Sequence, residues 1–251
     1  LFYIGGVCFL GACVWPFIGR GFNRPYLGAF IGLLWFFMPN NLCAIFIEGN
    51  LARSLSMIFL PVFIYSVYKY LYNHKLRYIP LMVFTFLLME LCHLGYAGMV
   101  AIAVIIYGIV YIIQKGRKKA VLDVVISMIF GFMLLGIWLV ASLRGGITSL
   151  DNSENMANFF QNLWITINPF ERLTRGFEYF YFGFATLVVI VFGILFGYKK
   201  SRTGFVTGFI ILLMTTKSAY AVLKHLPGSQ YLWMLRFISI ALCMILMSFL
   251  M

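Results

Sequence analysis

Acidic residues are scarce in this sequence, and charged residues of either sign are few. The 251 residues include 7 Asp and Glu against 19 Lys and Arg, and charged side chains make up only 10% of the chain. A soluble domain of this size carries about 25%. Because 63% of the residues are hydrophobic, no soluble fold could bury this much apolar surface, and lipid must be the solvent for most of it.

The signatures of several enzyme classes are missing as well. We find no phosphate-binding loop, dinucleotide fingerprint or nucleophile elbow. The five cysteines are odd in number and lack the spacing of zinc ligands. We therefore predict no metal site and no cofactor in this chain; a divalent cation is possible, but no residue pattern indicates one.

The apolar residues form continuous runs of about 20 residues instead of the period-two alternation of barrel strands. The sequence therefore predicts an all-α bundle of transmembrane helices. We predict a single transmembrane domain over residues 1–251 with about nine spans, near 2–18, 26–38, 54–72, 78–92, 96–114, 120–143, 179–198, 203–222 and 232–251. The second and fourth spans are short, which is typical of tilted, broken or partly re-entrant segments.

The basic residues predict which loops share a side of the membrane. Cytoplasmic loops carry an excess of Lys and Arg, where they meet anionic lipids. Alternation of the spans places four basic loops on the cytoplasmic side of the plasma membrane: Arg20 and Arg24, Lys69–Arg77, Lys115–Lys119 and Lys199–Arg202. These loops account for the net charge of +12, so we expect a lipid bilayer and no nucleic acid as partner. Asp123 is expected to pair with the third loop.

Most of the acidic residues fall in segments that this topology places outside, and we look for function there. In the first of these segments, Gly49 supplies a turn and Asn50 is a suitable N-cap for the next helix. A turn and a cap do not explain why Glu48 and Arg53 flank the helix start. The helix N-terminus together with Arg53 would form a seat for an anion or a phosphate group.

Two ionisable residues lie at the end of the fourth span. Glu90 stands within an apolar run, where a charge is costly and is a functional candidate. His93 follows three residues later, so the two share one face if the helix continues through both. They can simply pair with each other or with a neighbouring helix. Alternatively, a neutral imidazole at the outer surface can bind a hydroxyl or phosphate group or shuttle a proton.

Later outer segments add further candidates. Residues 154–167 place large apolar side chains at helical spacing opposite Asn, Gln and Thr, which predicts an amphipathic helix lying in the membrane interface. Arg172 and Arg175 follow it, either in a surface salt-bridge cluster or in the wall of a pocket. His225 precedes a Pro-Gly turn. Arg236 lies inside the last apolar run, where it should face a partner or a phosphate group or extend to the surface.

The order of these short motifs resembles a known family. Residues 48–53 read Glu-Gly-Asn-Leu-Ala-Arg before a span with Pro61, residues 93–97 read His-Leu-Gly-Tyr-Ala, and Asn-Pro-Phe and Leu-Arg-Phe follow at 168–170 and 235–237. The pattern is similar to that of bacterial multi-spanning membrane proteins with the 6-pyruvoyl-tetrahydropterin synthase-related domain. These proteins are grouped with the GT-C-like glycosyltransferases, which depend on polyprenyl-phosphate sugars. The resemblance implies no pterin chemistry.

The resemblance implies an enzyme of the extracytoplasmic face that takes a sugar from a polyprenyl-phosphate donor and transfers it to an acceptor. Such chemistry needs a carboxylate as general base and cations that stabilise the departing phosphate. The family's usual carboxylate lies in a first outer loop. We expect that loop upstream of Leu1, in a longer protein of which this chain is a fragment. Within the chain, Glu48, Glu90 and His93 are weaker catalytic candidates.

The candidates for binding the substrate are six basic residues: Arg53, His93, Arg172, Arg175, His225 and Arg236. Two other functions remain open. One is a transporter or flippase of a lipid-linked saccharide, which buried charges near the bilayer midplane would favour. The other is an O-antigen-type polymerase or ligase, which also uses arginines in outer loops.

Overall fold

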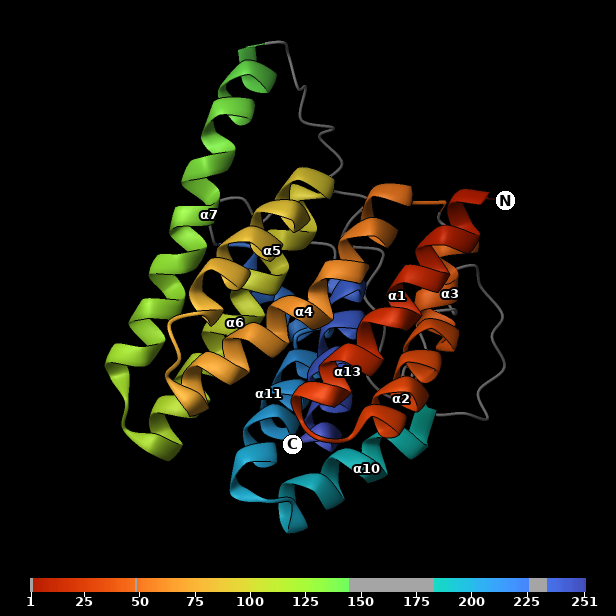
Figure 1. Cartoon of the computed structure of the whole chain (residues 1–251), viewed down its shortest axis with the longest axis vertical. Helices are drawn as coiled ribbons and strands as arrows, with labels where there is room; N and C mark the ends of the chain where they lie inside the picture. The colour runs from red at the N-terminus through yellow and green to blue at the C-terminus, as the bar shows by residue number, and fades with distance from the viewer. Residues whose placement is uncertain (1, 48, 145–182, 226–233) are drawn as a thin grey trace.

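The computed structural model describes residues 2–47, 49–144, 183–225 and 234–251, and every regular element in these ranges is helical (Figure 1). In chain order the elements are α1 (Phe2–Gly21), α2 (Pro25–Phe37), α3 (Pro39–Leu42), a π-helical turn (Cys43–Ile47), α4 (Leu51–Asn73), α5 (Tyr78–Cys92), α6 (Leu94–Lys115), α7 (Lys118–Arg144), α10 (Gly183–Phe196), α11 (Lys199–Leu213), α12 (Lys217–Leu223), a 3₁₀ turn (Met234–Arg236) and α13 (Phe237–Leu250). The predicted all-α class is confirmed for the described residues.

Several helices are long and apolar enough to cross a membrane. Among the described residues these are four segments: Tyr3–Gly21, Leu51–Asn73, Leu94–Lys115 and Lys118–Ala141. A fifth results if Pro25–Phe37 and Asn40–Phe46, which meet at 58°, form one broken span. This break lies in the second predicted span, whose short length already indicated an irregular segment. The apolar helices α5 and α13 are shorter, and α5 begins and ends where the fourth span was predicted.

The prediction of one continuous helix over residues 203–222 is wrong. Helix α11 ends at Leu213, and α12 begins only at Lys217. The hydroxyl of Thr215 donates to the carbonyl of Leu212 at 2.6 Å, and the side chain of Thr216 caps α12. Two adjacent threonines thus supply local side-chain hydrogen bonds that compete with the backbone hydrogen bonds of the helix.

The short helix α13 forms the centre of the bundle. All of its residues except Phe249 are buried, because α13 packs against α2, α4, α6 and α11. A helix that is apolar on every side belongs in a protein core or in the interior of a membrane. The guanidinium of Arg24 donates to the carbonyl of Phe249 at 3.1 Å, which ties the C-terminal end of α13 to the turn between α1 and α2.

The outer surface of α7 is apolar. Its exposed side chains recur every three or four residues: Leu122, Ile126, Ile129, Met133 and Ile137. Ile137 alone is 86% exposed. A continuous apolar stripe on the outside of a bundle is rare in soluble proteins, and it suits contact with lipid chains.

The four predicted basic loops lie together at one end of the bundle, the lower end in Figure 1. The ammonium of Lys69 donates to the carbonyl of Gly21 at 2.5 Å. The guanidinium of Arg117 contacts the imidazole of His74, which joins the α4–α5 and α6–α7 turns. The hydroxyl of Tyr72 donates to a backbone carbonyl at the start of α11 at 3.3 Å. We call this the basic-loop end.

Candidate functional site

A capped helix start positions the first candidate residue. Gly49 adopts a positive φ of 59°, and the side chain of Asn50 accepts a hydrogen bond from the backbone N–H of Arg53 at 2.9 Å. Both roles agree with the sequence prediction. Arg53 therefore stands in the first turn of α4 with its side chain 0% exposed. Full burial of a guanidinium is costly, so this residue is a functional candidate.

His93 joins two helices. Its backbone is extended (φ −156°, ψ 92°), its N–H donates to the carbonyl of Met89 at 2.8 Å, and its ring Nδ1 accepts from the N–H of Tyr96 at 3.1 Å. The same residue thus closes α5 and caps α6. Since α5 ends at Cys92, Glu90 and His93 do not share the face of one continuous helix, which was the condition for their predicted pairing.

Arg236 approaches His93 from the other part of the chain. It ends the 3₁₀ turn before α13, and it is only 8% exposed. Its Nη1 lies 3.0 Å from Nε2 of His93, although 143 positions separate the two residues in sequence. The structure therefore brings together Arg53, His93 and Arg236, three of the predicted binding residues, at the starts of α4, α6 and α13.

Tyr96 and Ser239 connect these residues, and the sequence analysis missed both. The hydroxyls of Tyr96 and Ser239 lie 2.8 Å apart. Because Ser239 donates its own hydrogen to the carbonyl of Arg236 at 2.8 Å, Tyr96 must be the donor of this pair. The ring of Tyr96 lies 5.9 Å from the guanidinium carbon of Arg53, in cation–π range. Tyr96 does belong to the quoted His-Leu-Gly-Tyr-Ala motif, whereas Ser239 carries no sequence signal.

We call Arg53, His93, Tyr96, Arg236 and Ser239 the His93 cluster. Both contacts of the His93 ring are with donors, the N–H of Tyr96 at Nδ1 and the guanidinium of Arg236 at Nε2. A neutral imidazole accepts at one nitrogen only, so its tautomer decides which contact is the hydrogen bond. The guanidinium groups of Arg53 and Arg236 only donate, and two such cations in one cluster favour an anionic oxygen. The positive ends of three helix dipoles add to this preference for an anion.

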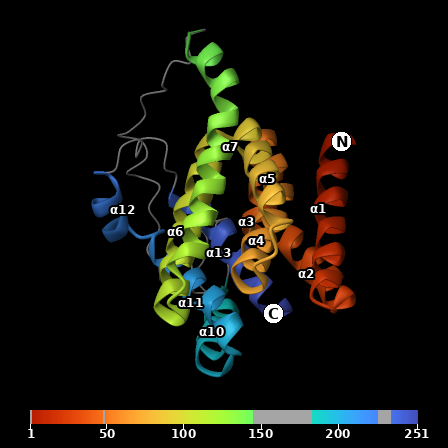
Figure 2. The ribbon, with the colours of Figure 1, turned by 60° about the vertical axis from the view of Figure 1, so that its left-hand side comes forward.

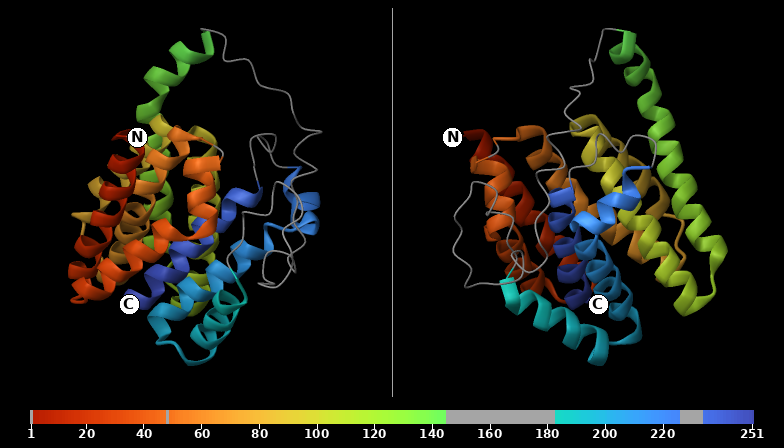
Figure 3. Two further views of the ribbon diagram at one scale, coloured as in Figure 1. Left: turned by 90° about the vertical axis from the view of Figure 1, so that its right-hand side faces the viewer. Right: turned by 180° about the vertical axis from the view of Figure 1, so that it is seen from behind.

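The His93 cluster lies away from the basic-loop end. Arg53 stands in the first turn of α4 and Lys69 lies four residues before its end, and 16 residues of α-helix span about 24 Å. The helix α13 runs in the same direction as α4, with its C-terminus at the basic-loop end (Figures 1 and 3). The two sets of cations therefore belong to opposite ends of one bundle.

Glu90 is the buried carboxylate nearest in sequence to the cluster. It is 3% exposed, and its Oε2 atom is buried with no hydrogen-bond partner among the described residues. The hydroxyl of Ser56 donates to the carbonyl of the preceding residue, Met89, at 3.3 Å, so the end of α5 lies against α4. A carboxylate in this position can accept a proton during a reaction or a transport step.

The remaining candidates fall into two groups. Glu48, Arg172, Arg175 and the predicted amphipathic helix at 154–167 lie outside the described residues. His225 is exposed just after α12, which Figure 2 shows at the side of the bundle, and it is not part of the His93 cluster. Among the described residues, no group of three or more His, Cys, Asp or Glu side chains could hold a metal ion.

Comparison with known proteins identifies the family. The model of the 6-pyruvoyl-tetrahydropterin synthase related domain, described as a membrane protein, matches residues 1–251. No match was found among curated proteins or among solved structures. The match agrees with the apolar helices and with the lipid-facing stripe of α7. The chain therefore belongs to the 6-pyruvoyl-tetrahydropterin synthase-related family of membrane proteins.

Proposed function

We propose that this protein is a membrane glycosyltransferase of GT-C-like architecture that binds the phosphate group of a polyprenyl-phosphate sugar at the His93 cluster. The convergence of Arg53, His93 and Arg236 from the starts of three helices carries the proposal. These donors suit a phosphate, and their place at the end of a bundle suits a phosphate whose lipid tail lies in the bilayer.

The chemistry of transfer assigns a part to each kind of residue. An acceptor hydroxyl attacks the anomeric carbon of the sugar, and the bond from that carbon to the phosphate oxygen breaks. The electron pair leaves with the polyprenyl phosphate, whose charge Arg53, His93 and Arg236 stabilise. The proton of the acceptor passes to a carboxylate, for which Glu90 and Glu48 are the candidates in this chain.

The same proposal includes an orientation in the plasma membrane. With about nine spans, the basic-loop end faces the cytoplasm and the His93 cluster faces outward. The grouping of the basic loops at one end supports this arrangement. Single cysteines at positions 118 and 152, in a chain without its native cysteines, should be labelled from opposite sides by an impermeant thiol reagent. Labelling of both from one side would contradict the orientation.

A second function deserves a test because of one observation. Buried carboxylates occur in the proton paths of transporters, and Glu90 is such a group. A transporter or flippase would move an intact lipid-linked saccharide across the bilayer. The further alternative, an O-antigen-type polymerase or ligase, would use the same cluster of arginines on a longer saccharide.

Binding of a polyprenyl monophosphate by the purified full chain tests the proposal directly. We expect binding of the phosphate but not of the corresponding polyprenol, measured by native mass spectrometry. Arg236→Gln should weaken it about tenfold, the effect of losing one charge-assisted hydrogen bond. The matched control Arg20→Gln removes the same charge at the basic-loop end and should leave the affinity unchanged. Equal binding of polyprenol, or equal loss in the control, would contradict the proposed site.

Proteoliposomes distinguish transfer from transport. A polyprenyl-phosphate hexose is supplied together with saccharide acceptors, and the products are separated by chromatography. A transferase releases polyprenyl phosphate and attaches the hexose to an acceptor, whereas a flippase moves the intact donor to the other leaflet. Growth of a repeating saccharide would favour the polymerase.

A further inference from the structure

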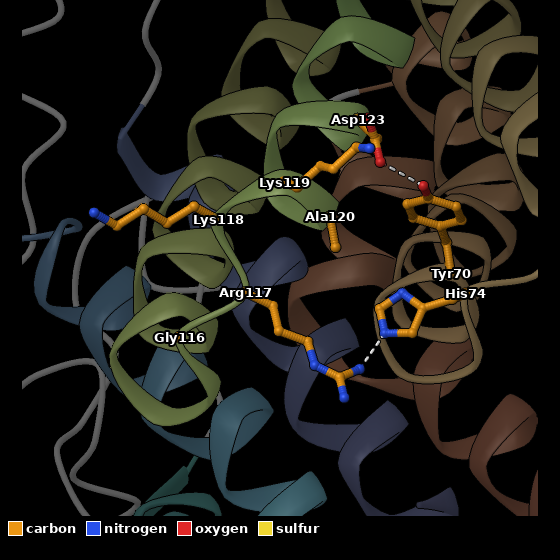
Figure 4. Close-up of a pocket in the computed structure, with 8 residues that line it drawn as sticks. All are labelled: Tyr70, His74, Gly116, Arg117, Lys118, Lys119, Ala120 and Asp123. Carbon is orange, nitrogen blue, oxygen red and sulfur yellow. Dashed lines mark hydrogen bonds between the residues drawn. The ribbon is translucent and has the colours of Figure 1, made fainter.

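A polar hollow lies at the basic-loop end between the end of α4 and the start of α7. It has a volume of about 410 Å³, and its lining includes Tyr70, His74, Arg117, Lys119 and Asp123 (Figure 4). The hydroxyl of Tyr70 donates to the carboxylate of Asp123 at 2.6 Å. Asp123 was predicted to pair with the basic loop; the hydrogen bond that the structure gives its carboxylate comes from Tyr70, and the Lys119 side chain of that loop extends towards it (Figure 4).

The cations of this hollow lie at the N-terminus of α7, where the helix dipole is unfavourable for positive charge. Arg117, Lys118 and Lys119 immediately precede or begin α7, and the first turn of α7 contains no acidic residue. A helix N-terminus carries a positive partial charge, which repels cations and attracts anions. Arg117 is also held in place, because its guanidinium contacts the ring of His74 (Figure 4). An anion in the hollow would offset this concentration of positive charge.

An apolar groove continues along the same helix. It has a volume of about 330 Å³ between α5 and α7, and its lining includes Ile79, Val83, Leu87, Phe130 and Leu134. On α7, Phe130 follows the Asp123 of the hollow by seven residues, or about 10 Å. The hollow and the groove therefore succeed one another from the membrane surface towards its interior, as the head and tail of a lipid do.

We propose that the hollow and groove together form a binding site for an anionic phospholipid. The phosphate of the headgroup accepts from Arg117 and Lys119, and one acyl chain lies along the groove between α5 and α7. Any lipid chain could occupy the groove, so the selection comes from charge in the hollow. A free phosphate ion would use the hollow alone. This site is separate from the His93 cluster and does not depend on the proposed transfer of sugar.

The sequence offers a matched pair of variants for a test. Lys118 and Lys119 are adjacent and carry the same charge, but in Figure 4 the Lys119 side chain points towards Asp123 while that of Lys118 points away. Lys119→Gln should weaken retention of phosphatidylglycerol about fivefold, the effect of one cation at a membrane surface. Lys118→Gln should retain it like the parent chain. Native mass spectrometry of the full chain, taken from nanodiscs of equal phosphatidylglycerol and phosphatidylcholine, measures the retained lipid.

A second pair tests the groove. Val83→Trp fills the groove and should displace the lipid, whereas Ile137→Trp lies on the exposed surface of α7 and should not. Excess inorganic phosphate tests whether the hollow binds free phosphate ions instead of the phosphate group of a lipid. Displacement of phosphatidylglycerol by millimolar phosphate, equal loss in both lysine variants, or equal retention of phosphatidylcholine would each overturn the proposal.

Discussion

The two ends of this bundle carry positive charge in opposite ways. At the basic-loop end many cations lie exposed in turns and at helix ends, as Arg117 and Lys119 do. At the other end, Arg53 and Arg236 are buried and converge with His93. Exposed cations cost little and orient a chain in the membrane, whereas buried cations are expensive. The comparison teaches that the informative charges are the few that the fold encloses.

Removal of the buried arginine should have the largest effect. Arg53→Met keeps much of the volume of the side chain but removes its charge, and we expect about 100-fold weaker binding of polyprenyl monophosphate, or about 2.7 kcal/mol. Arg20→Met at the basic-loop end, outside the hollow beside Arg117, should change this affinity less than about twofold. Native mass spectrometry measures both, and size-exclusion chromatography checks that each variant is folded. A larger loss in Arg20→Met would reverse the comparison between the ends.

His93 allows its two roles to be separated. Asn is a good N-cap residue, so His93→Asn should preserve the start of α6, while His93→Ala should cost about 1 kcal/mol of stability. Both changes remove the imidazole from the cluster and should weaken binding of the phosphate about tenfold. Thermal unfolding in detergent and the binding measurement together check this. If the Asn variant bound polyprenyl monophosphate like the parent chain, His93 would be a structural cap only.

The hydroxyl of Tyr96 should contribute mainly to stability. Tyr96→Phe removes the buried bond to Ser239, and we expect a loss of about 1 kcal/mol. The matched change Tyr72→Phe at the basic-loop end should cost less, about 0.5 kcal/mol, because water can replace a partly exposed partner. Chemical unfolding of both variants gives the two values. An equal loss of unfolding free energy in the two variants would show that polar groups are equally shielded from water at both ends.

The smallest effect is expected at an exposed cation. Lys75 lies in the turn between α4 and α5, and Lys75→Gln should shift the melting temperature by less than about 2 °C. Thermal unfolding of both Lys75→Gln and Tyr96→Phe is the check. A shift larger than that of Tyr96→Phe would mean that single basic-loop cations hold the fold together.

Hydropathy predicted helices well where no side-chain hydrogen bond competes with the backbone hydrogen bonds of the helix. The span at 78–92 coincides with α5, and the N-cap role of Asn50 is confirmed by its bond to the N–H of Arg53. The continuous span at 203–222 is wrong because hydropathy does not register the bonds of Thr215 and Thr216 that end α11 and start α12. The break at His93 was predicted, because the fourth span was placed to end at 92 and the next to begin at 96; the side-chain cap that His93 forms there was not predicted.

The site was predicted residue by residue but not as an assembly. Arg236 was identified because a charge within an apolar run is costly. Arg53 was identified because it flanks a helix start, and His93 because it lies at the outer end of a span. Their convergence depends on α13 lying at the centre of the bundle, which brings residues 143 positions apart to within 3.0 Å. Tyr96 and Ser239 were missed, because a tyrosine or serine in an apolar helix is common and acquires meaning only from its neighbours.

The amino-acid sequence by itself determined that the protein lies in a membrane and that its described elements are helices, because composition and periodicity act locally along the chain. It also predicted the grouping of the four basic loops, which lie at one end of the bundle. Only the tertiary structure decided which cations are enclosed. The packing of α4, α6 and α13 places Arg53, His93 and Arg236 at one point, and the turn between α6 and α7 sets Arg117 against His74. Such meetings depend on how distant helices pack, which no local pattern encodes.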